Sequence, residues 1–130
     1  MAETSPMKAR FLARIADRSA VTAVIGLGYV GLPLAMEFCE AGFSVIGYDV
    51  TQRLVDQLMR GESHIQDVPS SQVAAFVKSG KFIATTDEAA VSRADSVSIA
   101  VPTPLAKTRD PDMSYVIAAA EAVARRAHPG

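Results

Sequence analysis

Three glycines, Gly26, Gly28 and Gly31, follow directly on an apolar stretch at 21–25 with the spacing G-x-G-x-x-G. This spacing suits a phosphate site. The first glycine permits a tight turn, the second lets the backbone approach a pyrophosphate, and the third lets the next helix pack closely on the preceding strand. A helix beginning near Val30 would point its free N–H groups and the positive end of its dipole at the phosphates. The motif therefore predicts a dinucleotide-binding turn.

An acidic residue after the next apolar run supports this prediction. The run at 43–48 ends at Asp49, about twenty residues beyond the last glycine, as in dinucleotide-binding units. A carboxylate there accepts hydrogen bonds from both hydroxyls of an adenosine ribose and repels a 2′-phosphate, which favours NAD over NADP. Arg53 could instead accommodate that phosphate, so NADP is the minority alternative, and we interpret Arg53 as an adenine or ribose contact. A βαβ unit with an unrelated glycine turn is the other alternative.

The elements that must position these residues follow from the apolar periodicity and the helix-breaking residues. We expect strands at 21–25, 43–48, 81–85 and 96–101, and helices at 30–41, 51–60, 69–79, 87–93 and 112–127. Thr51 and Asp87 are the expected N-caps. In the helix after the glycines, one apolar face should carry Val30, Leu34, Phe38 and Ala41.

Strands that alternate with helices predict an α/β fold, a Rossmann-like doubly wound parallel sheet with strand order 3-2-1-4. We expect the sheet to be incomplete at the edge of strand 4, where an unpaired apolar edge would favour self-association. Ligands of such sheets bind at the carboxyl ends of the strands where the winding direction reverses, here strands 1 and 4.

A proline-bearing loop follows strand 4 and should face the glycine turn across that cleft. It contains Val101, Pro102, Thr103 and Pro104. The two prolines would fix the backbone and hold Thr103 in one orientation, as a contact to cofactor or substrate requires. A stiff turn without a binding role is the alternative.

Composition limits the possible functions. The 130 residues fit one domain, and the net charge of −1 gives no electrostatic argument for a nucleic-acid or membrane partner. No signal-peptide pattern is visible, and the single cysteine, Cys39, fits a cytoplasmic location. We expect residues 1–20 to form an N-terminal helical extension, whose basic face contacts solvent or a partner domain, and residues 21–130 to form the dinucleotide-binding domain.

The remaining reactive residues make no catalytic set and no metal site. Cys39 lies away from the helix N-terminus that would lower its pKa, so we interpret it as buried and inert. His64 lies in a polar loop with Glu62 and Asp67, and a solvated loop histidine is the favoured interpretation over a functional one. His128 has no expected role, and no Cys/His spacing indicates a metal ligand set.

Five stretches together resemble the N-terminal NAD-binding domain of the UDP-glucose/GDP-mannose dehydrogenase family. They are VIGLGYVGLPLA at 24–35, GYD at 47–49, GESHI at 61–65, TTD at 85–87 and VPTPL at 101–105. The combination of GYVGLP with VPTP is much more specific than the glycines alone. Within the family, HIQDV at 64–68 and PDMSY at 111–115 are most similar to UDP-N-acetylglucosamine or UDP-N-acetylmannosamine 6-dehydrogenases.

The resemblance implies a two-step oxidation of a sugar C6 alcohol to a carboxylate, with two NAD per product and a thioester on a catalytic cysteine. It also implies that Gly28, Tyr29 and Val30 bind the pyrophosphate, that Asp49 and Arg53 contact the ribose, and that Thr103 contacts the cofactor near its reacting end. Cys39 does not match the family's nucleophile. The family's central and UDP-binding domains are not represented, so a UDP-sugar partner is expected only for a full-length parent, which could be a homo-oligomer.

Three functions follow from the sequence. The chain is the NAD-binding part of a nucleotide-sugar 6-dehydrogenase of polysaccharide biosynthesis, truncated relative to the parent and inactive alone; UDP-glucose is the alternative sugar. It could instead be a stand-alone NAD-binding module without catalysis. A third possibility is another Rossmann enzyme, such as a relative of hydroxyacyl-CoA or phosphogluconate dehydrogenases, which the VPTP loop argues against.

Overall fold

The computed structural model describes residues 6–104, 107, 110 and 112–128. These residues form one parallel sheet of four strands, β1 (Val21–Ile25), β2 (Ser44–Tyr48), β3 (Phe82–Thr85) and β4 (Ser96–Ile99), in the order β3-β2-β1-β4. The helices are α1 (Pro6–Ala16), α2 (Gly31–Glu40), α3 (Gln52–Met59), α4 (Ser70–Ser79), the 3-10 helix η1 (Glu88–Arg93) and α5 (Ser114–Arg126). The predicted α/β class and strand order are confirmed.

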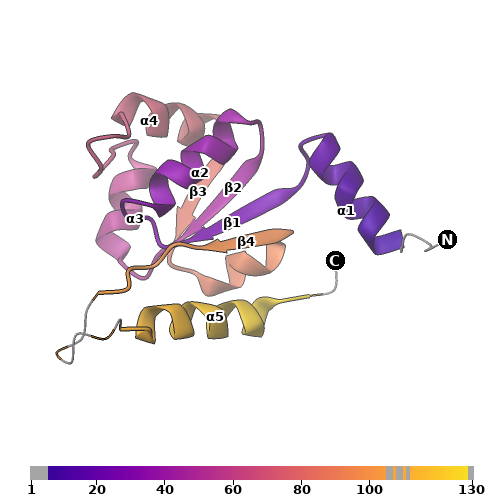
Figure 1. Ribbon diagram of the computed structural model, residues 1–130. Coiled ribbons are helices and arrows are strands. Elements are labelled where there is room, and N and C mark those ends of the chain that lie inside the picture. The colour runs from indigo at the N-terminus through magenta and orange to yellow at the C-terminus, as the bar shows by residue number, and fades with distance from the viewer. Residues whose placement is uncertain (1–5, 105–106, 108–109, 111, 129–130) are drawn as a thin grey trace.

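The helices cover the two faces of the sheet unequally. Figure 1 shows α2, α3 and α4 on one face, and η1 and α5 on the other. The chain changes faces between β3 and β4, so β1 pairs with β2 on one side and with β4 on the other. The carboxyl ends of β1 and β4 therefore diverge into loops at the point where the winding direction reverses, which is where such sheets bind ligands.

The two faces also carry side chains of different size. The face under α2, α3 and α4 is packed with large apolar residues, among them Leu27, Leu32, Leu58 and Phe82, which are fully buried. Burial of each such side chain stabilises the fold by roughly 1.5–3 kcal/mol. The opposite core cluster consists mainly of small residues and contains Ala23, Ile46, Ala90 and Ala94. The core on the side of η1 and α5 is consequently thin.

Helix α2 buries a face that coincides only in part with the expected apolar face. Its buried residues include Leu32, Ala35, Met36 and Cys39, which follow the i, i+3, i+4, i+7 spacing of one helix face. Of the expected face, Leu34 and Phe38 are half-buried and pack against this core, whereas the N-cap Val30 is 68% exposed and Ala41 is exposed. Gly31, at the start of the helix, packs directly against the Gly26 carbonyl and so brings the Leu32 side of the helix onto the sheet.

Smaller differences lie at the element ends. Asp87 caps η1 through the N–H of Ala89 at 3.0 Å, as expected, whereas the Thr51 side chain caps nothing. Strand β4 ends at Ile99, two residues earlier than expected, and pairs only with β1 among the described residues. None of the described helices has the length and apolar character needed to cross a bilayer.

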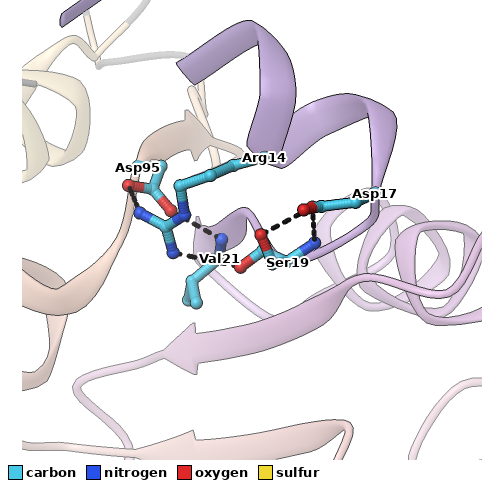
Figure 2. A network of polar contacts seen from close by, with 5 residues as sticks. All are labelled: Arg14, Asp17, Ser19, Val21 and Asp95. Atoms are coloured by element: carbon cyan, nitrogen blue, oxygen red, sulfur yellow. Dashed lines mark hydrogen bonds and ion pairs between the residues drawn. The ribbon is translucent and has the colours of Figure 1, made fainter. Parts of the chain in front are cut away.

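Helix α1 is attached to the sheet by polar contacts, since none of its residues is buried. Figure 2 shows how the Arg14 guanidinium reaches Asp95 at 2.6 Å and the Ser19 carbonyl at 3.0 Å. The other carboxylate oxygen of Asp95 accepts the N–H of Val21 at 2.8 Å, and this side chain is only 4% exposed. Asp95 thus joins α1 to the amino ends of β1 and β4, at the opposite edge of the sheet from the glycine turn.

We expect Asp95→Ala to lower the free energy of unfolding by about 2 kcal/mol, because it removes a charged acceptor from both the Val21 amide and Arg14. Urea denaturation of the 130-residue chain measures this. Glu62→Ala is the matched control, because its pair with Arg60, at 3.3 Å, is exposed on both sides. Such pairs contribute little, so this control should change stability by less than about 0.5 kcal/mol. Equal losses in the two variants would contradict the role of Asp95.

Candidate nucleotide-binding site

A cavity of about 800 Å³ opens at the carboxyl ends of β1, β2 and β4. Its walls come from the glycine turn at 25–30, the segment after β2, residues 99–102 after β4, and one side of α5. The volume lies within the range of ligand and cofactor pockets. It extends beneath the sheet toward α5, on the side where the core residues are small.

Two of the three glycines are required by the fold itself. Gly26 has φ +92°, and a Cβ there would lie 2.6 Å from the carbonyl oxygen of Ala100, in the segment after β4. A Cβ at Gly31 would overlap the carbonyl oxygen of Gly26. These two glycines therefore allow the turn to pack between β4 and the first turn of α2, as the spacing predicted.

Gly28 is different, because the described fold places no demand on it. Its φ is not positive, and no described atom would lie within 4 Å of a Cβ at this position. It lines the cavity. An absent side chain at a cavity wall leaves room for a ligand to approach the backbone closely, which is the role that the motif assigns to its second glycine.

The amino end of α2 points its backbone at this same wall. No described side chain caps the helix at Val30. The Leu32 N–H donates to the Gly28 carbonyl at 3.1 Å and Pro33 has no N–H, so the positive end of the helix dipole is the main attraction that this end of α2 offers an anion. Tyr29 and Val30 are exposed beside it at the mouth of the cavity.

Asp49 joins the glycine turn to the end of β2. Its Oδ2 accepts the N–H of Leu27 at 2.9 Å and its Oδ1 accepts the N–H of Thr51 at 3.0 Å, while its own N–H donates to the Thr85 carbonyl at 3.1 Å. A carboxylate oxygen can accept more than one hydrogen bond. The half-buried carboxylate is therefore fixed in orientation and still able to accept from a pair of hydroxyls in the cavity.

Seven of the ten site residues expected from the sequence line the cavity: Gly26, Gly28, Tyr29, Val30, Asp49, Val101 and Pro102. Gly31 lies behind the turn. Arg53 is exposed on α3, where Leu54 is the residue that turns into the cavity, and Thr103 lies exposed beyond Pro102 because β4 ends early. The structure does not bring Arg53 and Thr103 into the lining.

Helix α5 contributes a wall that the sequence reasoning missed. The lining residues are Tyr115, Ala118, Ala119, Ala122 and Arg125, which share one side of the helix. The signal was the recurrence of small residues at helical spacing in AAAEA at 118–122, which resembles ordinary core packing. Only the position of α5 against the thin face of the sheet makes this side a cavity wall.

His64 is not the solvated loop residue that was expected. Both of its ring nitrogens are shielded from solvent and have no hydrogen-bond partner among the described residues. Burial lowers the pKa of His64, and the neighbouring Leu27 backbone and Asp49 charge oppose this only in part. The imidazole is therefore neutral at neutral pH and lies behind the glycine turn.

The described residues place no catalytic or metal-binding set beside the cavity. Cys39 lies on the buried side of α2, and burial raises the pKa of its thiol to about 12. No group of His, Cys, Asp and Glu in the described part of the chain could hold a metal ion. The arrangement provides a place to bind a nucleotide and no nucleophile beside it.

Comparison with known proteins decides the family. Residues 20–130 match the model of the UDP-glucose/GDP-mannose dehydrogenase family, NAD binding domain. The chain belongs to this family. It is 44% identical over 102 residues to UDP-N-acetyl-D-mannosamine dehydrogenase of Salmonella typhi, covering 78% of this chain and 24% of the relative. Over 103 residues it is 42% identical to an NDP-N-acetyl-D-galactosaminuronic acid dehydrogenase of Ralstonia nicotianae, covering 78% of this chain and 24% of the relative.

Solved structures of nucleotide-sugar dehydrogenases have the same fold. A UDP-glucose dehydrogenase from Pyrobaculum islandicum superposes with a TM-score of 0.76 at 38% identity, covering 82% of this chain and 25% of that one. A GDP-mannose dehydrogenase from Pseudomonas aeruginosa superposes with a TM-score of 0.75 at 30% identity, covering 81% of this chain and 24% of that one. The chain spans about a quarter of the length of these relatives. It corresponds to the NAD-binding domain, and NAD is the cofactor of the family.

We expect Gly28→Ala to leave the thermal unfolding midpoint nearly unchanged and to weaken NAD binding at least about tenfold, because its methyl group meets no described atom and fills space at the wall of the cavity. Gly31→Ala should instead destabilise the fold, because its methyl group overlaps the Gly26 carbonyl. Calorimetric titration and thermal denaturation measure the two effects. Equal affinity of Gly28→Ala and the unsubstituted chain for NAD would show that the cofactor does not approach the backbone at Gly28.

We expect the Cys39 thiol to react with a disulfide reagent at mildly alkaline pH at least roughly a hundredfold more slowly in the folded chain than in concentrated urea. Only the thiolate is nucleophilic, and burial both raises the pKa and blocks access. Absorbance of the released thiol measures the rate. Equal rates in the two conditions would show that the cysteine is exposed.

Proposed function

We propose that residues 21–130 bind one NAD in the cavity at the carboxyl ends of β1, β2 and β4, as the nucleotide-binding part of a nucleotide-sugar 6-dehydrogenase, with residues 1–20 as an N-terminal extension. The observation that carries this proposal is Gly28. The fold places no demand for a glycine there, and the position lines the cavity together with Val30 at the amino end of α2 and with Asp49. A pyrophosphate against the backbone supplies the missing reason for the glycine.

The lining residues divide along the cofactor. The backbone of Gly28, Tyr29 and Val30 would hold the pyrophosphate, with Gly26 and Gly31 shaping the turn. Asp49 would accept from the adenosine ribose hydroxyls, and Val101 and Pro102 would border the nicotinamide half. We keep Arg53 and Thr103 as proposed contacts at the rim, outside the lining that the structure defines.

Asp49 makes NAD the proposed cofactor in preference to NADP. Two backbone amides fix the carboxylate, so it cannot turn aside without losing the bonds to Leu27 and Thr51. A phosphate on the 2′-hydroxyl would stand against this charge. Arg53, the cation that could compensate, is exposed and outside the lining.

For the whole protein we propose oxidation of the C6 alcohol of a nucleotide sugar, in the cytoplasm and in polysaccharide biosynthesis. Bound NAD would supply the hydride acceptor. The names of the curated relatives favour a UDP-N-acetyl hexosamine, and UDP-glucose is the alternative, from the name of the Pyrobaculum islandicum enzyme. The exposed edge of β4 makes homo-oligomerisation a further proposal.

The chain of 130 residues should bind NAD without oxidising any sugar. Its one cysteine is buried away from the cavity, so the thioester route has no nucleophile here. This property is shared by the dehydrogenase part and by a stand-alone NAD-binding module, which is the second candidate function.

We expect the chain to bind NAD more tightly than NADP. Asp49→Ala should lower the affinity for NAD by about tenfold and so reduce the difference between the affinities for the two cofactors. Calorimetric titration of both cofactors measures this. Asp56→Ala is the matched control, because this acid lies on α3, is exposed and bonds Gln52 outside the cavity. Thermal unfolding of both variants separates loss of binding from loss of fold. Tighter binding of NADP by the unsubstituted chain would refute the ribose assignment.

A further inference from the structure

A charged side chain from α5 lies on the cavity wall and has no role in the site described so far. Arg125 lines the cavity, and its Nε donates to Oε1 of Glu88, the first residue of η1, at 2.8 Å. Tyr48, the residue before Asp49, also lies within electrostatic reach of the guanidinium. Arg125 and Asp49 thus line the same cavity, with Arg125 on α5, which covers the opposite face of the sheet from α2.

The space beside Arg125 is lined mainly by apolar residues. On one side lie Ala118, Ala119 and Ala122 of α5, and on the other lie residues at the ends of β1 and β4, including Ile25 and Ile99. Because the core on this face is built from small residues, α5 and the sheet leave this space between them. Its apolar walls suit a flat aromatic ring.

We propose that Arg125, positioned by Glu88, binds the adenine base of the cofactor by placing its guanidinium against the ring. This inference rests on the proposed NAD site. If Asp49 holds the adenosine ribose, the base on that ribose extends past Tyr48 into the space under α5. A planar guanidinium stacks on an aromatic face and contributes cation–π attraction.

Glu88 orients this contact before the ligand arrives. The ion pair uses the Nε–H of Arg125 and leaves the two terminal NH₂ groups and the guanidinium plane for the ligand. Glu88 is 22% exposed and Arg125 is 57% exposed, so the acid is the better-held partner. A side chain that is already restrained loses less conformational entropy when it binds.

The ion pair between Arg125 and Glu88 is also consistent with the proposed preference for NAD over NADP, which carries a 2′-phosphate. The Glu88 carboxylate lies 2.8 Å from Nε of Arg125, so its negative charge balances the positive charge of the guanidinium. A balanced ion pair offers a phosphate less attraction than a lone cation. Arg125 therefore serves the base and not the phosphate.

The alternative is that the ion pair only fastens α5 to η1. Three ligands separate the two roles in the 130-residue chain: NAD, ADP-ribose, which carries the adenine half, and nicotinamide mononucleotide, which lacks it. Arg125→Lys keeps a cation that can pair with Glu88 and removes the planar guanidinium. Arg126→Ala is the matched control, because this arginine is exposed and lines no part of the cavity.

By calorimetric titration, Arg125→Ala and Arg125→Lys should each lower the affinity for NAD and for ADP-ribose about five- to tenfold and leave the affinity for nicotinamide mononucleotide unchanged. The lysine variant should be as thermally stable as the unsubstituted chain. Glu88→Gln should weaken the same two ligands two- to threefold, about what one restrained side chain contributes. Arg126→Ala should change none of the three ligand affinities.

Two outcomes overturn the inference and leave the proposed function intact. One is NAD binding by Arg125→Lys equal to that of the unsubstituted chain. The other is an equal loss of all three ligands in Arg125→Ala, which a purely structural role produces. Failure of the unsubstituted chain to bind either NAD or ADP-ribose would instead defeat the proposed function, on which the inference rests.

Discussion

The hydrogen bond from the Leu27 amide to the Asp49 carboxylate is the contact on which the site depends. It joins the glycine turn after β1 to the end of β2, two segments that the sequence separates by a whole helix. The same carboxylate accepts the Thr51 amide and so fixes the start of α3. One acid therefore sets the geometry of the turn and offers its remaining lone pairs to the cavity, so structural and binding demands coincide at this residue.

The unequal packing of the sheet explains where the cavity lies. Large side chains fill the face under α2, α3 and α4, and this rigid side holds the turn in place. On the other face, alanines from β1, η1 and α5 keep the backbone covered without filling the space above it. Protein interiors are close-packed where the side chains are large enough to meet. The alanines on this face are too small to fill the space between α5 and the sheet, and so they leave room for a ligand.

Residues whose positions depend on local backbone geometry were predictable from the sequence. The turn glycines, Asp49 and the strand order follow from spacing and topology rules that need no tertiary information. Residues whose direction depends on rotation or packing were not. The most deeply buried side of α2 was not foreseen, because it follows from the packing of Gly31 against the Gly26 carbonyl in the folded turn. Arg125 was missed because a basic residue in the last turn of a helix is common, since it interacts favourably with the helix dipole. Only the position of α5 in the fold shows that this arginine lines the cavity.

The roles assigned to the turn, to Asp49 and to α5 all depend on the binding of one NAD at the carboxyl ends of β1, β2 and β4. This binding can be measured by titrating NAD into the isotopically labelled chain and following the amide NMR shifts. The largest shifts are expected at Leu27, Gly28 and Tyr29, at Asp49 and Thr51, and on the cavity side of α5, with α1 and α4 unchanged. Saturable binding with its shifts confined to α1, α4 or the amino ends of the strands would contradict it.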